Sequence, residues 1–83
     1  KGEISDFEIF PNPSNGNFSI SFHGLENNYN SIEIIDIKGK VMQKSKLSGS
    51  NLERLNQDLP NGLYFIKLNN DESYKVKKLY IID

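Results

Sequence analysis

Apolar and polar residues alternate along several short stretches of this chain. In Asn17–Phe22, Phe18, Ile20 and Phe22 fall on one side of an extended backbone, and polar residues fall on the other. Alternation of this length is typical of a β-strand with one buried face. The same kind of pattern predicts further short strands at residues 7–10, 31–37, 40–46, 51–56, 64–68 and 73–82.

The segments between these strands carry residues that favour tight turns. Asp36–Gly39 has Asp at its first position and Gly at its fourth, where a side-chain oxygen can accept turn N–H groups and a positive φ is tolerated. Leu59–Gly62 combines Pro with Gly, and Asn69–Glu72 is uniformly polar. These turns come every 8 to 12 residues, and about seven strands result. We therefore predict an all-β fold, a single immunoglobulin-like antiparallel β-sandwich.

Two strands depart from simple alternation. In 31–37 the apolar residues change side at Ile34–Ile35, which indicates either burial on both faces or a β-bulge. In the last strand the apolar positions change from Tyr74 and Val76 to Leu79 and Ile81, and we expect a change of face there. On the 64–68 strand the neighbouring residues Leu63 and Phe65 face away from the core, where either a loop covers them or they form an exposed contact patch.

Composition narrows the class of protein. The chain has 83 residues, enough for one small domain, with 36% hydrophobic residues and a net charge of -1. It has no Cys, which excludes disulfides and thiolate zinc sites, and no apolar run reaches the ~18 residues of a membrane-spanning helix. The segment KGEISDFEIF lacks the features of a signal peptide. Because a chain this short must bury roughly 60% of its unfolded surface, we expect nearly every apolar residue in the core.

Few residues are suited to catalysis or metal binding. His23 is the single His, and beside Gly24 we expect it at an exposed loop edge and not in a catalytic triad. Asp71 and Glu72 lack the spacing of a calcium loop, and the glycines are isolated turn residues. The sequence therefore predicts no catalytic residue, no metal site and no cofactor.

Charge is distributed unevenly along the chain. Residues 1–36 hold one basic and six acidic side chains (net -5), and residues 37–83 hold nine basic and five acidic (net +4), which together give -1. A near-neutral chain without a basic domain does not favour nucleic-acid binding. Either acidic early strands pair with basic late strands, or Lys75, Lys77 and Lys78 form a docking surface for an acidic partner.

Four motifs occur in a fixed order: Phe10-Pro11-Asn12-Pro13-Ser14-Asn15-Gly16, Ile35-Asp36-Ile37-Lys38-Gly39-Lys40, Leu59-Pro60-Asn61-Gly62-Leu63-Tyr64-Phe65-Ile66-Lys67-Leu68, and Lys77-Lys78-Leu79-Tyr80-Ile81-Ile82. In order and spacing they resemble the C-terminal sorting domain of type IX secretion cargo, the Por secretion tail. The resemblance covers about residues 7–83, which would be the sorting domain. Residues 1–6 would then be the end of an upstream linker.

The resemblance implies a non-catalytic domain at the end of larger proteins exported by Gram-negative bacteria of the Bacteroidota group. The upstream cargo would be exported across the inner membrane and carried through the outer-membrane translocon to the cell surface or the extracellular space. A sortase-like surface protease would then remove the domain, at or before residues 1–6. The implied partners are the translocon, the protease and the cargo domain of the same chain, and dimerisation through edge strands stays open.

The chemistry of the motif residues suggests a role for each of them. The terminal strand and the turn near it are the candidates for translocon recognition, by strand addition with lysines fixing the orientation: Lys77, Lys78, Leu79, Tyr80, Ile81, Ile82, Asp36 and Gly39. The other motif residues are expected to be mainly structural: Pro11, Asn12, Pro13, Gly16, Pro60, Gly62 and Tyr64.

Two other functions remain alternatives. One is a carbohydrate-binding or adhesive β-sandwich appended to a secreted enzyme, which would depend on Tyr29 or Tyr80 for stacking, since Trp is absent. The other is a structural module that stabilises the upstream domain.

Overall fold

The computed structural model describes residues 7–22, 29–48, 52–70 and 73–83, which form seven β-strands. They are β1 (Phe7–Phe10), β2 (Asn17–Phe22), β3 (Ser31–Asp36), β4 (Val41–Lys46), β5 (Leu52–Asn56), β6 (Gly62–Asn69) and β7 (Tyr74–Ile81). The described residues contain no helix, and so no helix that could cross a membrane. The all-β prediction is confirmed.

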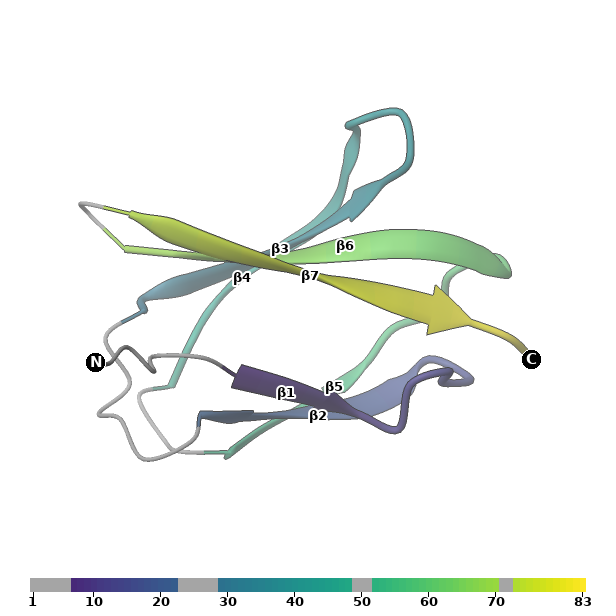
Figure 1. Cartoon of the computed structure of the whole chain (residues 1–83), viewed down its shortest axis with the longest axis horizontal. Helices are drawn as coiled ribbons and strands as arrows, with labels where there is room; N and C mark the ends of the chain where they lie inside the picture. Colours follow the sequence, from purple (N-terminus) through teal and green to yellow (C-terminus); the bar gives the residue numbers. More distant parts are fainter. Residues whose placement is uncertain (1–6, 23–28, 49–51, 71–72) are drawn as a thin grey trace.

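The strands form two antiparallel sheets that pack face to face (Figure 1). One sheet has three strands in the order β1-β2-β5, and the other has four in the order β4-β3-β6-β7. In Figure 1 the four-stranded sheet is the upper layer and the three-stranded sheet the lower one. This arrangement confirms the predicted sandwich.

The core lies between the two sheets and is built by alternate residues of each strand. On β2 the buried residues are Phe18, Ile20 and Phe22, as the sequence pattern predicts. Side chains from two inner faces interdigitate in this way in packed sheets. The complete set of buried hydrophobic residues is Phe7, Phe18, Ile20, Phe22, Ile32, Ile34, Tyr64, Ile66, Leu68, Leu79 and Ile81.

A β-bulge occurs where the sequence pattern of residues 31–37 changes side. Ile34 pairs with Gln43 and Ile35 pairs with Val41, so Met42 is the extra residue of β4. A bulge was one of the two predicted explanations for the pattern of 31–37, but its extra residue lies in β4 and leaves the alternation of β3 unchanged. β3 itself pairs regularly with β6 across the same positions.

The last strand does not change face, contrary to the expectation from its pattern. β7 pairs with β6 without interruption, from Asn69 opposite Tyr74 to Gly62 opposite Ile81. Leu79 and Ile81 therefore point into the core, while Tyr74 lies on the outer face of the sheet together with Val76. β7 is a regular strand with apolar residues on both faces. The order of apolar and polar residues alone does not distinguish such a strand from one that contains a bulge.

The expectation that nearly every apolar residue enters the core is also wrong. Eight large hydrophobic residues are exposed: Phe10, Ile37, Val41, Leu52, Tyr74, Val76, Tyr80 and Ile82. Isolated exposed apolar side chains are ordinary in proteins, but these are unevenly distributed between the two sheets. The predicted linker 1–6, His23 and Gly24 at the loop edge, and the hairpin tip Asp71–Glu72 lie outside the described residues.

Candidate interaction surface

β7 divides the predicted recognition residues between two faces of the four-stranded sheet. Leu79 and Ile81 are 0% and 1% exposed, so in the folded domain they hold the strand in place and are not available to a partner. Lys78, Tyr80 and Ile82 are exposed on the outer face. Lys77 shares the inner face with Leu79 and is half-buried, and its ammonium nitrogen lies 5.7 Å from the centroid of the Phe7 ring.

The edge of β7 is paired along its C-terminal half with the connection between β1 and β2. The Asn12 side chain donates to the Lys78 carbonyl and accepts from the Tyr80 N–H, both at 2.9 Å. The Ser14 N–H donates to the Tyr80 carbonyl, and the Ser14 carbonyl accepts from the Ile82 N–H, both at 2.8 Å. Four backbone groups of the terminal strand are thus satisfied by residues more than sixty positions away in the sequence.

Ser14 is the buried centre of this connection, and sequence reasoning did not single it out. It is 3% exposed, and its hydroxyl donates to the Asn17 carbonyl and accepts from the Gly16 N–H. Gly16 has φ of +112°, and a Cβ there would lie 2.3 Å from the Gln57 carbonyl oxygen. Only Gly fits this close approach. A Ser two residues before a turn Gly was the available signal.

The Pro residues flank Asn12 in the same connection. Pro11 and Pro13 are both exposed, and the peptide bonds before them are cis. The structure therefore places Pro11, Asn12, Pro13 and Gly16 in one loop, whose contacts reach the terminal strand through Asn12 and Ser14.

The predicted turn at Asp36–Gly39 closes the hairpin between β3 and β4. One carboxylate oxygen of Asp36 accepts from the N–H groups of Lys38 and Lys40, both at 2.9 Å, and Gly39 has φ of +90°. The hydrogen bond from the Lys40 N–H, with a second from Lys38 and the two nearby ammonium groups, outweighs desolvation and lowers the pKa of the Asp36 carboxyl.

This turn and the end of β7 lie at the same end of the four-stranded sheet. Asp36 pairs with Tyr64 on β6, and Tyr64 pairs with Leu79 on β7. Because neighbouring strands lie about 4.8 Å apart, the backbones of Asp36 and Leu79 are separated by roughly 10 Å, with β6 between them. A partner that covers this end of the sheet reaches both.

Tyr64 joins the fold of β6 to the turn before it. Its ring is 5% exposed, and its hydroxyl donates to the Pro60 carbonyl at 2.6 Å. A Tyr at the start of this strand that bonds back a few residues is the tyrosine corner of immunoglobulin-like sandwiches. In the same turn the Asn61 side chain accepts from the Asp83 N–H, and Gly62 begins β6. The hydrogen bond from Tyr64 gives Tyr64 and Pro60 roles in the fold.

The outer faces of the two sheets differ in chemistry. Six of the eight exposed hydrophobic residues lie on the four-stranded sheet or its hairpin turn, and Phe10 and Leu52 lie on the other sheet. The outer face of the four-stranded sheet consists of Ser31, Glu33, Ile35, Val41, Lys44, Lys46, Leu63, Phe65, Lys67, Asn69, Tyr74, Val76, Lys78 and Tyr80. Leu63 and Phe65 are half-buried there, and their pairing partners on β7 are Tyr80 and Lys78.

The charges on this face include a pairing of an early acid with late bases, as one of the two charge predictions expected, whereas of Lys75, Lys77 and Lys78 one alone, Lys78, lies here. Glu33 forms an ion pair with Lys44 at 3.6 Å and pairs in register with Lys67, which places an early acid between two late lysines. The face still has an excess of three positive charges, since Lys44, Lys46, Lys67 and Lys78 accompany one acid. The Lys67 ammonium also lies 4.6 Å from the centroid of the Tyr74 ring.

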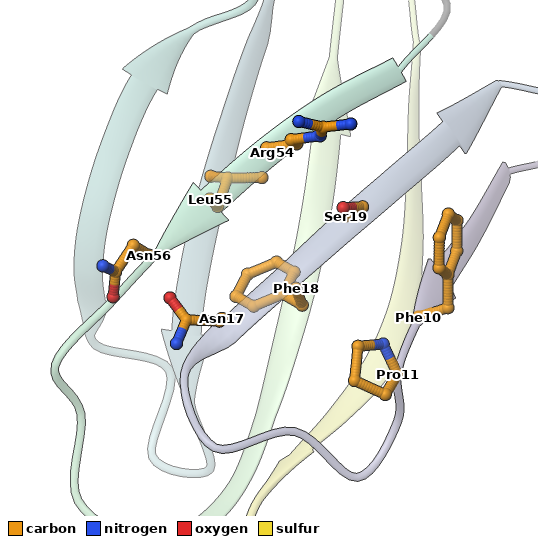
Figure 2. Close-up of a pocket in the computed structure, with 8 residues that line it drawn as sticks. All are labelled: Phe10, Pro11, Asn17, Phe18, Ser19, Arg54, Leu55 and Asn56. Carbon is orange, nitrogen blue, oxygen red and sulfur yellow. The ribbon is translucent and has the colours of Figure 1, made fainter.

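The outer face of the three-stranded sheet carries a small open pocket of about 470 Å³ (Figure 2). Phe10 and Pro11 line one side, and Arg54 lies on β5 on the other, with β2 between them. Ser19 pairs with both Phe10 and Arg54, so the three share this face. The other lining residues are Asn17, Phe18, Leu55 and Asn56.

The residues proposed for sugar stacking do not form one site. Tyr29 is half-buried and packs against the core, whereas Tyr80 is 43% exposed on the outer face of the four-stranded sheet. Among the described residues no group of three or more His, Cys, Asp or Glu side chains is arranged to hold a metal ion.

Comparison with known proteins identifies the relatives of this chain. Residues 8–82 match the family model described as "Secretion system C-terminal sorting domain". The chain is also 30% identical over 79 residues to a protein of Formosa agariphila named "Endo-acting ulvan lyase". That alignment covers 94% of this chain but 15% of the relative, so the chain spans a small part of the relative's length.

Proposed function

Because the chain belongs to the family of secretion system C-terminal sorting domains, we propose that the type IX translocon recognises it through the outer face of the four-stranded sheet. The domain is a sorting signal without catalytic activity, and it directs export to the cell surface or the extracellular space. The predicted family is thereby confirmed. The contact surface and the steps after translocation belong to the proposal.

The observation that carries the proposal is the concentration of exposed apolar side chains on one face. Val41, Tyr74, Val76 and Tyr80 are each 43–62% exposed on the outer face of the four-stranded sheet. Apolar surface gathered on one side of a soluble domain is typical of a protein–protein contact. The three excess positive charges on this face favour a partner with acidic groups around an apolar centre.

The proposal retains the predicted recognition residues that are accessible. Lys78, Tyr80 and Ile82 would contact the partner, and the turn from Asp36 to Gly39 would contact it at the same end of the sheet. Leu79 and Ile81 act through the core, and Lys77 lies on the inner face. Strand addition at Lys78–Ile82 would first have to displace Asn12 and Ser14, so a side-chain contact on the outer face is favoured.

The remaining steps concern the longer protein. We infer that residues 1–6 connect the sorting domain 7–83 to an upstream cargo, since the chain matches 15% of a much longer relative. A sortase-like surface protease would cut at or before these residues after export. Mass spectrometry of the exported cargo locates the new C-terminus, and a mature cargo that retains residues 7–83 would contradict this step.

A reporter fusion tests the recognition surface. We expect a fluorescent reporter fused to residues 1–83 to reach the medium or the cell surface of a type IX-competent host. Combined Lys78→Ala, Tyr80→Ala and Ile82→Ala substitutions should reduce export at least tenfold, with the reporter retained in the periplasm. The matched control, Ser19→Ala with Ser21→Ala and Asn56→Ala, changes three outer-face positions of the other sheet and should be exported normally.

Folding must be checked in each variant by its urea unfolding midpoint. Normal export of the folded triple variant would overturn the proposed surface while leaving the sorting function intact. Periplasmic retention of the unmodified fusion would instead show that residues 1–83 are insufficient for sorting. Deletion of 79–83 would remove Leu79 and Ile81 from the core, so it cannot separate recognition from folding.

A further inference from the structure

We propose that the edge of β7 from Tyr74 to Lys78 binds an extended acidic segment of a protein partner, which adds to the four-stranded sheet as its next strand. Asn12 and Ser14 determine where this added strand must end. The inference concerns the edge of the sheet, so it goes beyond the outer-face contact proposed above and does not depend on it.

Asn12 and Ser14 form the cover on the C-terminal half of the β7 edge, and they bond to it as a neighbouring strand would. The Asn12 amide provides one donor and one acceptor, as a backbone residue would, and Ser14 continues with its own N–H and carbonyl. Ser14 forms a parallel bridge with Ile81. From the Lys78 carbonyl onwards, the edge is therefore already paired.

The N-terminal half of the same edge has no such cover in the part of the chain described. The edge-directed groups belong to Lys78, Tyr80 and Ile82, and alternation along the strand directs the N–H and carbonyl groups of Tyr74 and Val76 to the same side. Among the described strands, β7 is the last of its sheet and pairs with β6 alone. Unpaired edge groups of this kind are a template for another strand.

The side chains around this half select the kind of partner. β7 carries three lysines and no acid, and its two exposed lysines point to opposite sides of the sheet, Lys75 to the inner side and Lys78 to the outer face. A second copy of the chain, paired through the same edge, would bring lysines against lysines, which is unfavourable across a sheet. An extended segment whose alternate Asp or Glu residues lie on the Lys75 side of the sheet gives opposite charge at Lys75, and its backbone supplies the hydrogen bonds.

The open length limits the size of the segment. Four residue steps from Tyr74 to Lys78 correspond to about 14 Å of strand, so roughly five residues of a partner fit before Asn12 is reached. A longer strand requires Asn12 and Ser14 to leave the edge. The cover therefore sets both the register and the length of the added strand.

A peptide titration tests the proposal on the 83-residue chain labelled with ¹⁵N. The probe is a blocked synthetic hexapeptide of alternating Glu and Thr, and the control peptide replaces each Glu with Lys. We expect the Glu peptide to shift the amide resonances of Tyr74, Val76 and Lys78, and the Lys peptide to bind at least tenfold more weakly. Asn12→Ala frees the Lys78 carbonyl and the Tyr80 N–H, so it should extend the shifts to Tyr80.

Two substitutions on the edge sharpen the test. Val76→Pro removes an edge-directed N–H without removing a hydrogen bond to β6, a position where Pro is tolerated in a sheet, and should weaken binding at least tenfold. Lys75→Glu should weaken it about two- to fivefold, as expected for an exposed charge pair. The matched charge change Lys46→Glu on β4, the opposite edge of the same sheet, should leave binding unchanged.

Three results of the peptide titration would overturn the proposal. They are equal binding of the Glu and Lys peptides, unchanged binding by a folded Val76→Pro variant, and peptide shifts located away from β7. Self-association of the chain that Val76→Pro abolishes, measured by sedimentation, would assign the edge to a second copy and also overturn the acidic partner. None of these measurements involves export, so their outcome is separate from that of the reporter fusion.

Discussion

The two sheets contribute to one core by the same alternation, yet their outer faces are chemically different. The three-stranded sheet presents the polar residues Ser19, Ser21, Asn17 and Asn56 together with Phe10 and Leu52, and its charges Glu8 and Arg54 sum to zero. The four-stranded sheet presents aromatic and aliphatic side chains with an excess of three lysines. Because inner-face residues hold the sandwich together, the outer faces are free to differ. An apolar, cationic outer face is not needed for folding, and the difference therefore points to a partner.

The strongest test of this comparison uses neighbouring residues of β7. Leu79→Ala removes a fully buried side chain and should lower the free energy of unfolding by about 2–5 kcal/mol, from lost burial and the cavity left behind. Tyr80→Ala, on the outer face, should lower it by less than about 1 kcal/mol. Urea denaturation followed by circular dichroism measures both values. If the two substitutions were equally destabilising, the outer face would be part of the folding core and the comparison would fail.

A smaller loss of stability is expected for the loop between β1 and β2, which bonds to the edge of the other sheet. Asn12 lies between β1 and β2, and its side chain makes two hydrogen bonds to β7. Asn12→Ala should lower the free energy of unfolding by about 1–3 kcal/mol, at roughly 0.5–1.5 kcal/mol for each bond. Amide hydrogen exchange at Tyr80 should accelerate more than exchange at Leu79, which is bonded towards β6.

Asn12→Asp is the matched control for that prediction. A carboxylate still accepts from the Tyr80 N–H but cannot donate to the Lys78 carbonyl, so only the first bond is kept. Faster exchange at Tyr80 in the Ala variant than in the Asp variant is the expected order. Unchanged exchange in both would show that the edge cover contributes nothing to the terminal strand.

Two Tyr hydroxyls allow a further comparison, because that of Tyr64 is bonded within the fold and that of Tyr80 lies on the exposed face. Tyr64→Phe removes the hydrogen bond to the Pro60 carbonyl and should lower the free energy of unfolding by about 1 kcal/mol. Tyr80→Phe changes a hydroxyl on the exposed face and should have an effect near zero. Thermal unfolding of both variants measures the difference, and equal midpoints would remove Tyr64 from the residues that stabilise the turn.

The sequence was sufficient to predict the strands and the sandwich, because both depend on local alternation and turn chemistry. Phe18, Ile20 and Phe22 alternate with polar residues, and the structure buries all three. Asp36 and Gly39 have turn roles that follow from their residue types, and the observed hydrogen bonds match them. Predictions of this kind use interactions between residues a few positions apart.

The features that the sequence did not predict depend on long-range contacts, which leave no periodic pattern of residue types. The hydrogen bond from Asn12 to Lys78 joins residues 66 positions apart. Nothing in the local sequence around Asn12 indicates that its side chain bonds to the last strand. Tyr74 and Val76 are apolar, so the pattern placed them in the core, whereas the uninterrupted register of β7 turns them outward. Long-range pairing decides both cases, and it also decides which surface a partner can reach.

The smallest expected effect concerns pH and the turn that adjoins the recognition surface. The N–H of Lys40, followed by that of Lys38, binds the Asp36 carboxylate and lowers its pKa in the folded state. A carboxyl whose pKa is lower when folded stabilises the fold above its unfolded pKa of about 3.9, and this contribution disappears as pH falls through the folded pKa. Asp36→Asn should therefore lower the melting temperature slightly at pH 6, and the difference from the unmodified chain should shrink below pH 4.

The control for this prediction is Asp58→Asn, an exposed carboxylate outside the turn. It removes the same charge but no bond to Lys38 or Lys40, so its effect should not reproduce the pH dependence of Asp36→Asn. Thermal unfolding of the three proteins between pH 2 and pH 6 makes the comparison. If both Asn variants followed the same curve, net charge would explain the effect, and the turn would contribute to the outer surface by its shape alone. If only Asp36→Asn differed, the carboxylate would itself hold the hairpin beside Tyr64 and the end of β7, where a partner must fit.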